Sequence, residues 1–531
     1  MPIKDNLKTV LVIGAGPSVV GHGTEHNLAA WKACRLLRKN GIRVVALDSN
    51  PASLALENDA SDCGYVEPLT EATIRKIIEK ERPNAILPIA GGQIALTLCS
   101  QAAESIRAAG IVVLGLSLEA ISSVGDRLCF AGLAKEAGGA VLPSEAAASP
   151  EEAAAAVPKV GGFPVVLRPF CVTAGTGSSV VYNHEELKES TFRATKNSPV
   201  RTTLVERAVL GWKEAICQVL RDSAGNSVVA GIIETIDPMG VHTGDSAAVF
   251  PAQTFSGKQL ETIAALACSI ADRVGLEGSA DIEFAINPRD PGEIVVMEMN
   301  PCISRCSAMI SFATGFSTVE AAVRLALGEA LAEVCPDPPE PKAVAVRVPQ
   351  FAFEKFPAAR LELGTSMKSI GESMALGSTF REAFQKALRG PIGGRDGFGF
   401  DSRDRFLATE DGDLKRKLSA SQPGNFFYIK PAMELGMSIA EIAAASGIDV
   451  FFLRELRALL DTARSMQRHE LTADLLRKAK SEGFSDAQIA AIVGQTPAGI
   501  AALRAERGCV RVCVPAVRAP CARCARADAA L

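Results

Sequence analysis

The chain has 531 residues, of which 48% are hydrophobic and 22% are charged. This length is typical of about three or four domains, and the hydrophobic fraction is enough for sizeable cores. The formal net charge of −4 gives no general attraction to nucleic acid or to a membrane surface, and no apolar run is long enough to span a bilayer.

The cysteines and the N-terminus bear on the cellular compartment. The 14 cysteines are scattered singly over most of the chain, which is typical of reduced thiols rather than of a disulfide framework. The first ten residues lack the layout of a signal peptide. We therefore expect a cytoplasmic protein that binds neither nucleic acid nor membrane.

Strands and helices alternate over residues 1–122, a pattern that predicts a parallel sheet covered by helices. The predicted strands are 9–13, 43–47, 85–88 and 111–114, and the predicted helices are 29–40 and 74–81. The turn Gly14-Ala15-Gly16 and the later Asp48 resemble part of a dinucleotide-binding fingerprint. Because Val19 stands where its third glycine belongs, we favour glycines that serve tight turns over nicotinamide binding.

Residues 123–335 hold the candidate chemistry. A strand at 164–168 leads through a loop of small residues to a second strand at 180–182. Such a loop can expose backbone N–H groups to phosphate, although it is not a P-loop. Further on, Glu214 is either a ligand for ribose hydroxyls or a charge on a strand face. His242, which lies among glycines, is either catalytic or structural.

A predicted hairpin at 280–305 carries the acidic residues. Alternation of apolar and polar side chains over 281–286 predicts a half-buried strand, and a second strand covers 294–299. Side chains two residues apart share a face, so Glu298 and Asn300 lie together, and Glu283 on the other strand can face them. Two carboxylates and an amide suit Mg²⁺. The alternative is a solvated hairpin that is acidic by chance.

Helices are predicted to dominate from residue 401 onward, at 439–445, 450–464, 473–482 and 486–493. A proline-rich connector at 336–341 and a linker at 391–400 precede them. Two stretches resemble small helix-turn-helix units, but without a basic stripe a helical packing domain is favoured. In the tail, Cys521 and Cys524 could bind zinc with Cys509 and Cys513, although the spacing favours a disordered tail.

A series of ordered motifs resembles the amino-terminal half of the carbamoyl-phosphate synthetase large subunit. They are G-A-G-P-x-V-x-G (14–21), D-S-N-P (48–51), G-G-Q-x-A-L (91–96), G-W-K-E (211–214), M-G-x-H-T-G-D-S (239–246), P-A-Q-T (251–254), E-M-N-P (298–301) and F-x-F-E-K-F (351–356). The resemblance implies an α/β fold with a pre-ATP-grasp domain at 1–122 and an ATP-grasp domain at 123–335. It then implies the rest of the carboxyphosphate module at 336–400, an all-α oligomerisation domain at 401–508 and a tail at 509–531.

The resemblance implies an ATP-grasp ligase that uses ATP and Mg²⁺, or Mn²⁺, to phosphorylate bicarbonate to carboxyphosphate, which reacts with ammonia in pyrimidine and arginine metabolism. It also implies a homo-oligomer, a glutaminase small subunit and a second synthetase half as partners. Two alternatives stay open. One is an ATP-grasp ligase with a different carboxylate acceptor, and the other is a catalytically impaired homologue with a binding or assembly role.

Site residues follow from the same resemblance. The residues that match nucleotide contacts are Arg127, Arg168, Gly175, Val209, Glu214, Gly240, Val241, His242, Glu283 and Glu298. The metal ligands fall on Glu283, Glu298 and Asn300, and the catalytic residues on His242, Asn300 and Arg305. Glu283 stands where the family has glutamine.

The departures from the family concern the substrate side. Cys302 replaces an arginine that holds the bicarbonate-derived anion, and a neutral thiol cannot replace a guanidinium. Such a loss costs about 3 kcal/mol, on the order of a hundredfold in rate. Ala174, Ser178 and Ser179 replace loop glycines. Arg207 replaces a glutamate near the adenosine, and the preceding Glu206 is expected on the other face of the strand. We therefore expect weak or absent bicarbonate-dependent turnover.

Overall fold

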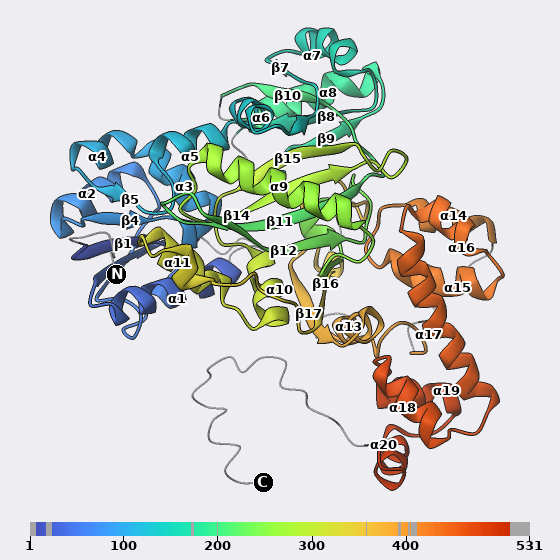
Figure 1. The fold of residues 1–531 in the computed structure, drawn as a ribbon. Coiled ribbons are helices and arrows are strands. Elements are labelled where there is room, and N and C mark those ends of the chain that lie inside the picture. Colours follow the sequence, from blue (N-terminus) through green and yellow to red (C-terminus); the bar gives the residue numbers. More distant parts are fainter. Residues whose placement is uncertain are drawn as a thin grey trace.

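The computed structural model describes residues 7–16, 24–170, 175–198, 200–356, 358–390, 394–401, 404 and 411–509. The Cys-rich tail beyond Cys509, and with it most of the proposed zinc ligands, lies outside these residues, as do Val19 and Ala174. Figure 1 shows a body of sheets and helices, with the C-terminal helices forming an arm on its right-hand side.

The first region folds as the predicted parallel sheet, in the strand order β3-β2-β1-β4-β5. Its strands are β1 (Thr9–Ile13), β2 (Arg43–Asp48), β3 (Cys63–Val66), β4 (Ala85–Leu87) and β5 (Val112–Val113). Its helices are α1 (Thr24–Lys39), α2 (Glu71–Glu81), α3 (Gly92–Gln101), α4 (Ala103–Ala108) and α5 (Leu118–Gly125). The half-exposed edge strand β3 was not predicted, because a short edge strand lacks a buried apolar run.

Alternating side chains of β1 serve two different cores. Leu11 and Ile13 pack with residues of α2, α3 and α4 on one face. Val10 and Val12 pack with α1 on the other face, together with α11 (Thr318–Ala326) from much later in the chain. Burial on both faces explains why the strand reads as a continuous apolar run.

A small antiparallel sheet, in the order β7-β10-β8-β9, follows. Its strands are β7 (Ser144–Ala147), β8 (Val165–Pro169), β9 (Ser179–Val181) and β10 (Thr203–Arg207). The helices α7 (Pro150–Ala156) and α8 (His184–Asn197) contribute to its core. The predicted hairpin around the small-residue loop is thus confirmed as β8 paired with β9. Before this sheet, α6 (Arg127–Glu136) begins at Asp126, which caps it through the N–H groups of Leu128 and Cys129.

An eight-stranded sheet forms the centre, in the order β17-β16-β13-β12-β11-β14-β15-β6. Its strands are β6 (Ala140–Val141), β11 (Lys213–Arg221), β12 (Ser227–Thr235), β13 (Ala248–Phe250), β14 (Gly278–Ile286), β15 (Ile294–Asn300), β16 (Val344–Gln350) and β17 (Gly371–Gly377). Helix α9 (Gly257–Val274) packs on one face. On the other face lie α10 (Arg305–Thr314) and α11, and the short α12 (Leu331–Val334) follows α11.

The prediction that residues 281–286 form a half-buried strand is wrong in its burial. β14 is a central strand, and all its residues except the intermediate Glu283 are buried. Helix α9 covers one face, while the polar residues of the other face contact each other and α10. Alternation therefore reflects a polar buried site rather than solvent.

The C-terminal region is helical, as predicted. It comprises α13 (Phe380–Ala387), α14 (Asp411–Ser419), α15 (Ile429–Glu434), α16 (Ile439–Ser446), α17 (Val450–Arg468), α18 (Ala473–Ser481), α19 (Asp486–Val493) and α20 (Pro497–Glu506). One hydrophobic cluster joins these helices to β16 and α13. Within the expected linker, residues 397–399 are buried, and Phe398, which is 1% exposed, belongs to this cluster.

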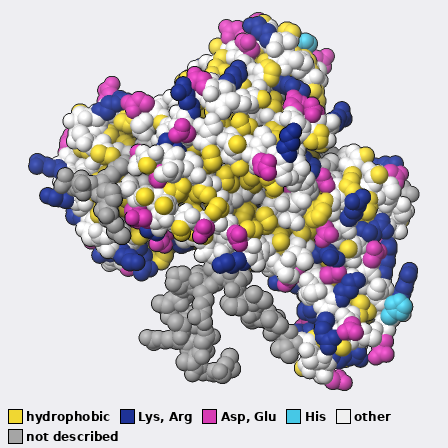
Figure 2. Space-filling model, in the orientation of Figure 1, with side chains coloured by type: hydrophobic (Ala, Val, Ile, Leu, Met, Phe, Trp, Pro, Cys, Tyr) yellow, Lys and Arg dark blue, Asp and Glu magenta, His cyan; other side chains and the backbone are white. Residues whose placement is uncertain are grey.

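The surface in Figure 2 mixes acidic and basic side chains, and hydrophobic side chains gather over its middle. No single helix among the described residues is long and apolar enough to cross a bilayer. Together α10 and α11 reach that length and composition, with a bend of 114° between them.

Candidate active site

The hairpin of β14 and β15 brings the three predicted metal ligands together. Glu283 lies directly opposite Glu298 in the antiparallel register. The Asn300 Nδ2 atom lies 3.3 Å from Glu298 Oε1 and 3.5 Å from Glu283 Oε1. The predicted convergence of two carboxylates and one amide is therefore present in the fold. Half a turn of the Asn300 amide would direct its oxygen toward the same space.

A β-bulge makes this convergence possible. Glu283 pairs with Glu298, but the next residue, Phe284, pairs with Val296, so Met297 has no partner of its own. Val296 and Met299 both point into the core beneath α9. The extra residue thus moves Glu298 to the opposite face from Val296. Strict period-two alternation from Ile294 would have buried Glu298 in that core.

Arg127 and the two carboxylates set the charge of this cluster. The Arg127 guanidinium donates a hydrogen bond to Glu298. Burial alone would raise the pKa of Glu298, but the charges of Arg127 and Arg168 outweigh it and lower the pKa to about 2. Burial, followed by the charges of Glu298 and Glu214, raises the pKa of Glu283 well above its ordinary value. The pKa values of the two neighbouring carboxyl groups are therefore shifted in opposite directions.

The donor set fits a hard divalent cation. No group of three or more His, Cys, Asp or Glu side chains is arranged as a metal site within the part of the chain that the structure describes. Two carboxylates completed by an amide and by substrate oxygens are, however, a usual Mg²⁺ arrangement. The charge of such a cation would favour the ionised form of both glutamates.

Arg168 and Glu206 form a second ion pair, on the small sheet. Arg168 Nε lies 3.0 Å from Glu206 Oε2, and both side chains are largely buried. Leu204 stands opposite Arg168 in the register, so Glu206 shares its face. Arg207 points the other way, as expected, and lies 3.7 Å from Glu293 and over the Trp212 ring. Glu206 thus remains near the predicted phosphate contacts, and Arg207 does not.

Glu214 is buried on the site side of β11, not on a solvent-facing strand surface. The Thr243 hydroxyl donates to Glu214 Oε1 at 2.8 Å. Burial raises the pKa of Glu214 to about 7; the Thr243 hydrogen bond opposes this shift and the Glu298 charge adds to it. Val209, one of the predicted nucleotide contacts, is buried in a small cluster with Trp212.

Gly240, Val241 and His242 lie in the connection between β12 and β13. His242 donates its backbone N–H to Gly364 O at 2.8 Å, and its Nδ1 accepts the Gly244 N–H at 3.0 Å. The Nδ1 atom is thereby committed as an acceptor. Its ring also adjoins the small-residue loop, because a Cβ on Gly175 would lie 3.4 Å from His242 Cδ2.

Gly175 has little space around it. Its φ is +64°, and a Cβ there would lie 2.1 Å from the carbonyl oxygen of Thr365. The Ser366 hydroxyl donates to Gly175 O at 2.6 Å. A larger residue is excluded at this position by both the conformation and the contact. The described end of the predicted phosphate loop is therefore held against residues 365–366.

Arg305 begins α10 and lies among acidic groups from distant parts of the chain. Its Nε is 3.6 Å from Glu25 of α1, and its Nη1 is 3.6 Å from Glu372 of β17. Arg347 of β16 lies 3.4 Å from the same Glu372 carboxylate and donates to Thr243 O at 3.0 Å. Arg347 and Glu372 are not among the site residues predicted from the sequence, because neither belongs to a motif that resembles the family.

Cys302 stands at the start of the same segment and is 5% exposed. Burial, followed by the charges of Asp281 and Glu25, raises the pKa of its thiol to about 12. The thiol is thus neutral and packed in the core shared with α9. It cannot supply the positive charge expected from an arginine at this position.

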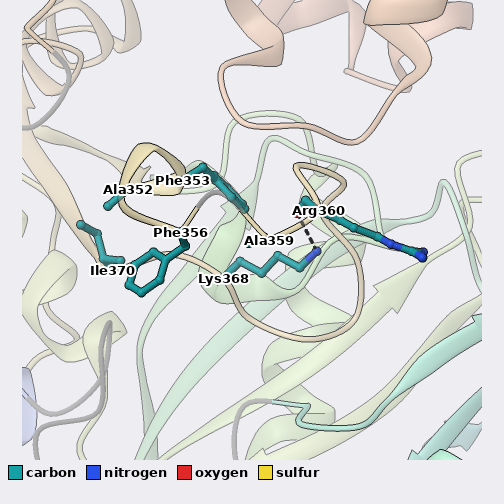
Figure 3. Close-up of a pocket in the computed structure, with 7 residues that line it drawn as sticks. All are labelled: Ala352, Phe353, Phe356, Ala359, Arg360, Lys368 and Ile370. Carbon is teal, nitrogen blue, oxygen red and sulfur yellow. Dashed lines mark hydrogen bonds between the residues drawn. The ribbon is translucent and has the colours of Figure 1, made fainter.

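Two cavities lie away from the acidic hairpin. One, of about 430 Å³, is lined by Phe353, Phe356, Arg360, Lys368 and their neighbours, with the Lys368 side chain lying across it (Figure 3). The other, of about 600 Å³, lies between β16 and the 422–428 segment and includes Asp245. The second cavity also has carboxylates with raised pKa values, Asp237 and Asp245. We assign the site to the hairpin because the three predicted metal ligands converge there beside Arg127.

The small antiparallel sheet and the eight-stranded mixed sheet, with a carboxylate-bearing hairpin and arginines from both sheets, define an ATP-grasp domain that follows a pre-ATP-grasp domain. Solved structures share this fold. The biotin carboxylase domain of Hydrogenobacter thermophilus 2-oxoglutarate carboxylase, solved with MgADP, ADP and bicarbonate, matches with a TM-score of 0.53 and 22% identity over 66% of this chain and 76% of that one. Campylobacter jejuni biotin carboxylase matches with a TM-score of 0.55 and 17% identity, covering 81% of this chain and 97% of that one.

The chain belongs to the carbamoyl phosphate synthase large chain family. Family models match the preATP-grasp domain at 6–123, the ATP binding domain at 126–334 and the oligomerisation domain at 372–508. The large chain of Synechocystis is 40% identical over 96% of this chain and 48% of its own length. The N-terminal section of the Aquifex aeolicus large chain is 38% identical over 96% of this chain and 93% of its own length. The chain therefore spans about half the length of most of these relatives.

Proposed function

We propose that this chain binds ATP with a divalent cation and transfers the γ-phosphoryl group to bicarbonate, forming carboxyphosphate for carbamoyl phosphate synthesis. The observation that carries this proposal is the placement of Glu283, Glu298 and Asn300 beside Arg127. Arg347 donates a hydrogen bond to Thr243 O and shares the Glu372 carboxylate with Arg305. One set suits MgATP, and the other suits an anionic acceptor. The names of the relatives support the same reaction.

The chemistry of phosphoryl transfer consists mainly of positioning and charge stabilisation. We propose that Arg127 and Arg168 both contact phosphate oxygens when nucleotide binds. Arg127 would then leave its ion pair with Glu298, and Arg168 would leave its ion pair with Glu206. Glu214 would accept the ribose hydroxyls, and the backbone of Val209 would contact adenine. Glu283, Glu298 and Asn300 would hold Mg²⁺, or Mn²⁺, which supplies charge neutralisation of the phosphate oxygens.

Arg305 would orient the acceptor. Bicarbonate oxygen attacks the γ-phosphorus, and the bond from that phosphorus to the ADP oxygen breaks, giving ADP and carboxyphosphate. His242, Gly240 and Val241 would line the transferred group, together with the loop at Gly175. Ammonia then attacks the carboxyphosphate carbon, releasing phosphate and a proton and leaving carbamate.

A second synthetase half would carry out the later phosphorylation of carbamate. A glutaminase small subunit would supply ammonia, and a homo-oligomer is proposed from the helical domain of the family. A cytoplasmic location is part of the same proposal.

Bicarbonate-dependent hydrolysis of ATP by the purified chain tests the proposal. Stimulation by bicarbonate, with further change on adding ammonia, supports it. Hydrolysis that depends on a different carboxylic acid would establish a ligase with another acceptor. Saturable MgATP binding without turnover under any of these conditions would instead establish a binding or assembly role.

A further inference from the structure

The helical region contains two copies of one local structure. Ser438 caps α16 and Ser485 caps α19, each in a capping box with the residue three positions later, Glu441 or Gln488. Both helices end at a left-handed glycine, Gly447 with φ 72° and Gly494 with φ 68°. In the sequence these read G-M-S-I-A-E-I-A-A-A-S-G and G-F-S-D-A-Q-I-A-A-I-V-G. Because the two copies follow the same local rules, a difference between their turns reflects what each turn contacts.

Among the residues that the structure describes, only the first of these two turns contacts the ATP-binding domain. A Cβ on Gly447 would lie 2.8 Å from Pro238 Cγ, whereas no atom lies within 4 Å of the corresponding position at Gly494. Residues 494–498 of the second turn are largely exposed. The first turn therefore connects the helical region to the ATP-binding domain, whereas the second turn is largely exposed.

The residue that caps the helix after each turn also differs, and again the first copy makes a contact that the second does not show. Thr496 caps α20 by accepting the Gly499 N–H at 3.1 Å. Asp449 caps α17 with Oδ1, which accepts the Phe451 N–H at 2.8 Å, and its Oδ2 lies 2.5 Å from Lys213 Nζ. Capping needs only an oxygen acceptor, as Thr496 shows. The second carboxylate oxygen of Asp449 is thus used for the lysine.

Lys213 and Pro238 each adjoin a proposed nucleotide segment. Lys213 begins β11, immediately before Glu214, and its Nζ lies 2.6 Å from Thr254 Oγ1. Pro238 precedes Met239, whose N–H donates to Trp212 O and whose carbonyl accepts the Gly211 N–H, both at 2.8 Å. Segments 211–214 and 239–242 are therefore joined to each other. The same helical turn contacts Lys213 of the first segment and Pro238, which directly precedes the second.

We propose that the α16–α17 turn is a positioning element for the nucleotide site, with Asp449 and Lys213 as positioning residues. The inference rests on the proposed function in so far as the ligand is MgATP. Holding the two segments in place before binding reduces the ordering cost of binding. The helical domain thereby contributes to nucleotide affinity without touching the nucleotide.

The test is Asp449→Thr, which keeps the helix cap and removes the ion pair. The dissociation constant for MgADP and the KM for ATP are expected to rise about three- to tenfold, with kcat unchanged. Asp449→Glu should restore most of the affinity. Thr496→Asp, which changes the corresponding position of the second copy, is the matched control and should bind as the unchanged chain does. A variant that merely loses folded protein would show a lower kcat and an unchanged KM.

Hydrogen exchange separates this inference from the proposed function. Asp449→Thr should speed exchange of the amides in 212–214 and 239–242, and Thr496→Asp should not. If the unchanged chain fails to bind MgADP, the proposed function fails, while faster exchange in the Asp449 variant still supports the positioning role. Unchanged exchange in these segments, or unchanged MgADP affinity in a chain that binds it, would overturn the inference.

Discussion

The two ends of the candidate site differ in how their charges are matched. At the hairpin, Glu298 is paired with Arg127, and Glu283 lies beside them with a raised pKa. At the end that we propose for the acceptor, Arg305 and Arg347 share Glu372, and Cys302 contributes a buried, neutral thiol. The hairpin thus has two carboxyl groups beside one arginine. At the other end, both arginines already form ion pairs with carboxylates.

This difference indicates which step is more vulnerable. A divalent cation would complete the hairpin, since its charge matches the excess carboxylate. An anionic acceptor must compete with Glu372 and Glu25 for Arg305. We therefore expect nucleotide binding to be robust and acceptor binding to be the weaker function.

The largest expected effect is at the hairpin. Glu298→Gln removes one ionised ligand and should lower ATP turnover about 10²- to 10³-fold, because charge stabilisation of the phosphate oxygens is lost. Steady-state hydrolysis at saturating Mg²⁺ measures this. Glu261→Gln, on the exposed side of α9, is the control and should behave as the unchanged chain. Near-normal turnover in Glu298→Gln would remove the hairpin from the mechanism.

Arg305→Ala separates the two ends. It should lower the bicarbonate-dependent rate about a hundredfold, because a guanidinium contact to the acceptor is lost, and leave MgADP affinity unchanged. Rate measurements and equilibrium binding on the same preparation compare the two. Arg273→Ala, which removes an arginine paired with Glu136 at the surface, is the matched control. Equal loss of nucleotide affinity would contradict the assignment of Arg305 to the acceptor.

Cys302→Arg should improve binding of the anionic acceptor, because it adds a guanidinium to the end of the site that we propose for it. Asp281 and Glu25 lie close enough to affect the thiol pKa, so an introduced guanidinium has carboxylates beside it. We expect the bicarbonate-dependent rate to rise about tenfold or more. Cys302→Met adds volume without charge and controls for overpacking. A folded Cys302→Arg variant with no gain would refute the explanation based on this residue.

The smallest effect is a pH dependence of stability. The pKa of Glu214 is about 7 in the folded chain against an ordinary 4.5, so folding takes up a proton between these values. Stability should therefore fall as pH rises from about 5 to 7, by on the order of 2 kcal/mol. Glu214→Gln, whose amide oxygen can still accept from Thr243, should flatten this slope in thermal unfolding of the nucleotide-free chain. An unchanged slope would show that Glu214 titrates normally.

The sequence predicts the hairpin and the shared face of Glu298 and Asn300, because both depend on local alternation. It does not predict the bulge at Met297, since no single side chain marks where an extra residue is inserted. Arg347, Glu372 and Glu25 join Arg305 only through long-range packing, which a local pattern does not contain. Phe398 was assigned to a linker on account of its glycine neighbours, although its own burial holds that segment in the helical core.

The most direct test of phosphoryl transfer to bicarbonate is to follow bicarbonate oxygen. The chain is incubated briefly with MgATP and bicarbonate labelled with ¹⁸O, and the inorganic phosphate is analysed by mass. Attack by bicarbonate leaves one labelled oxygen on phosphorus after the carboxyphosphate decomposes, and Glu298→Gln should abolish that signal. Phosphate released in a bicarbonate-dependent reaction without any label would contradict the account.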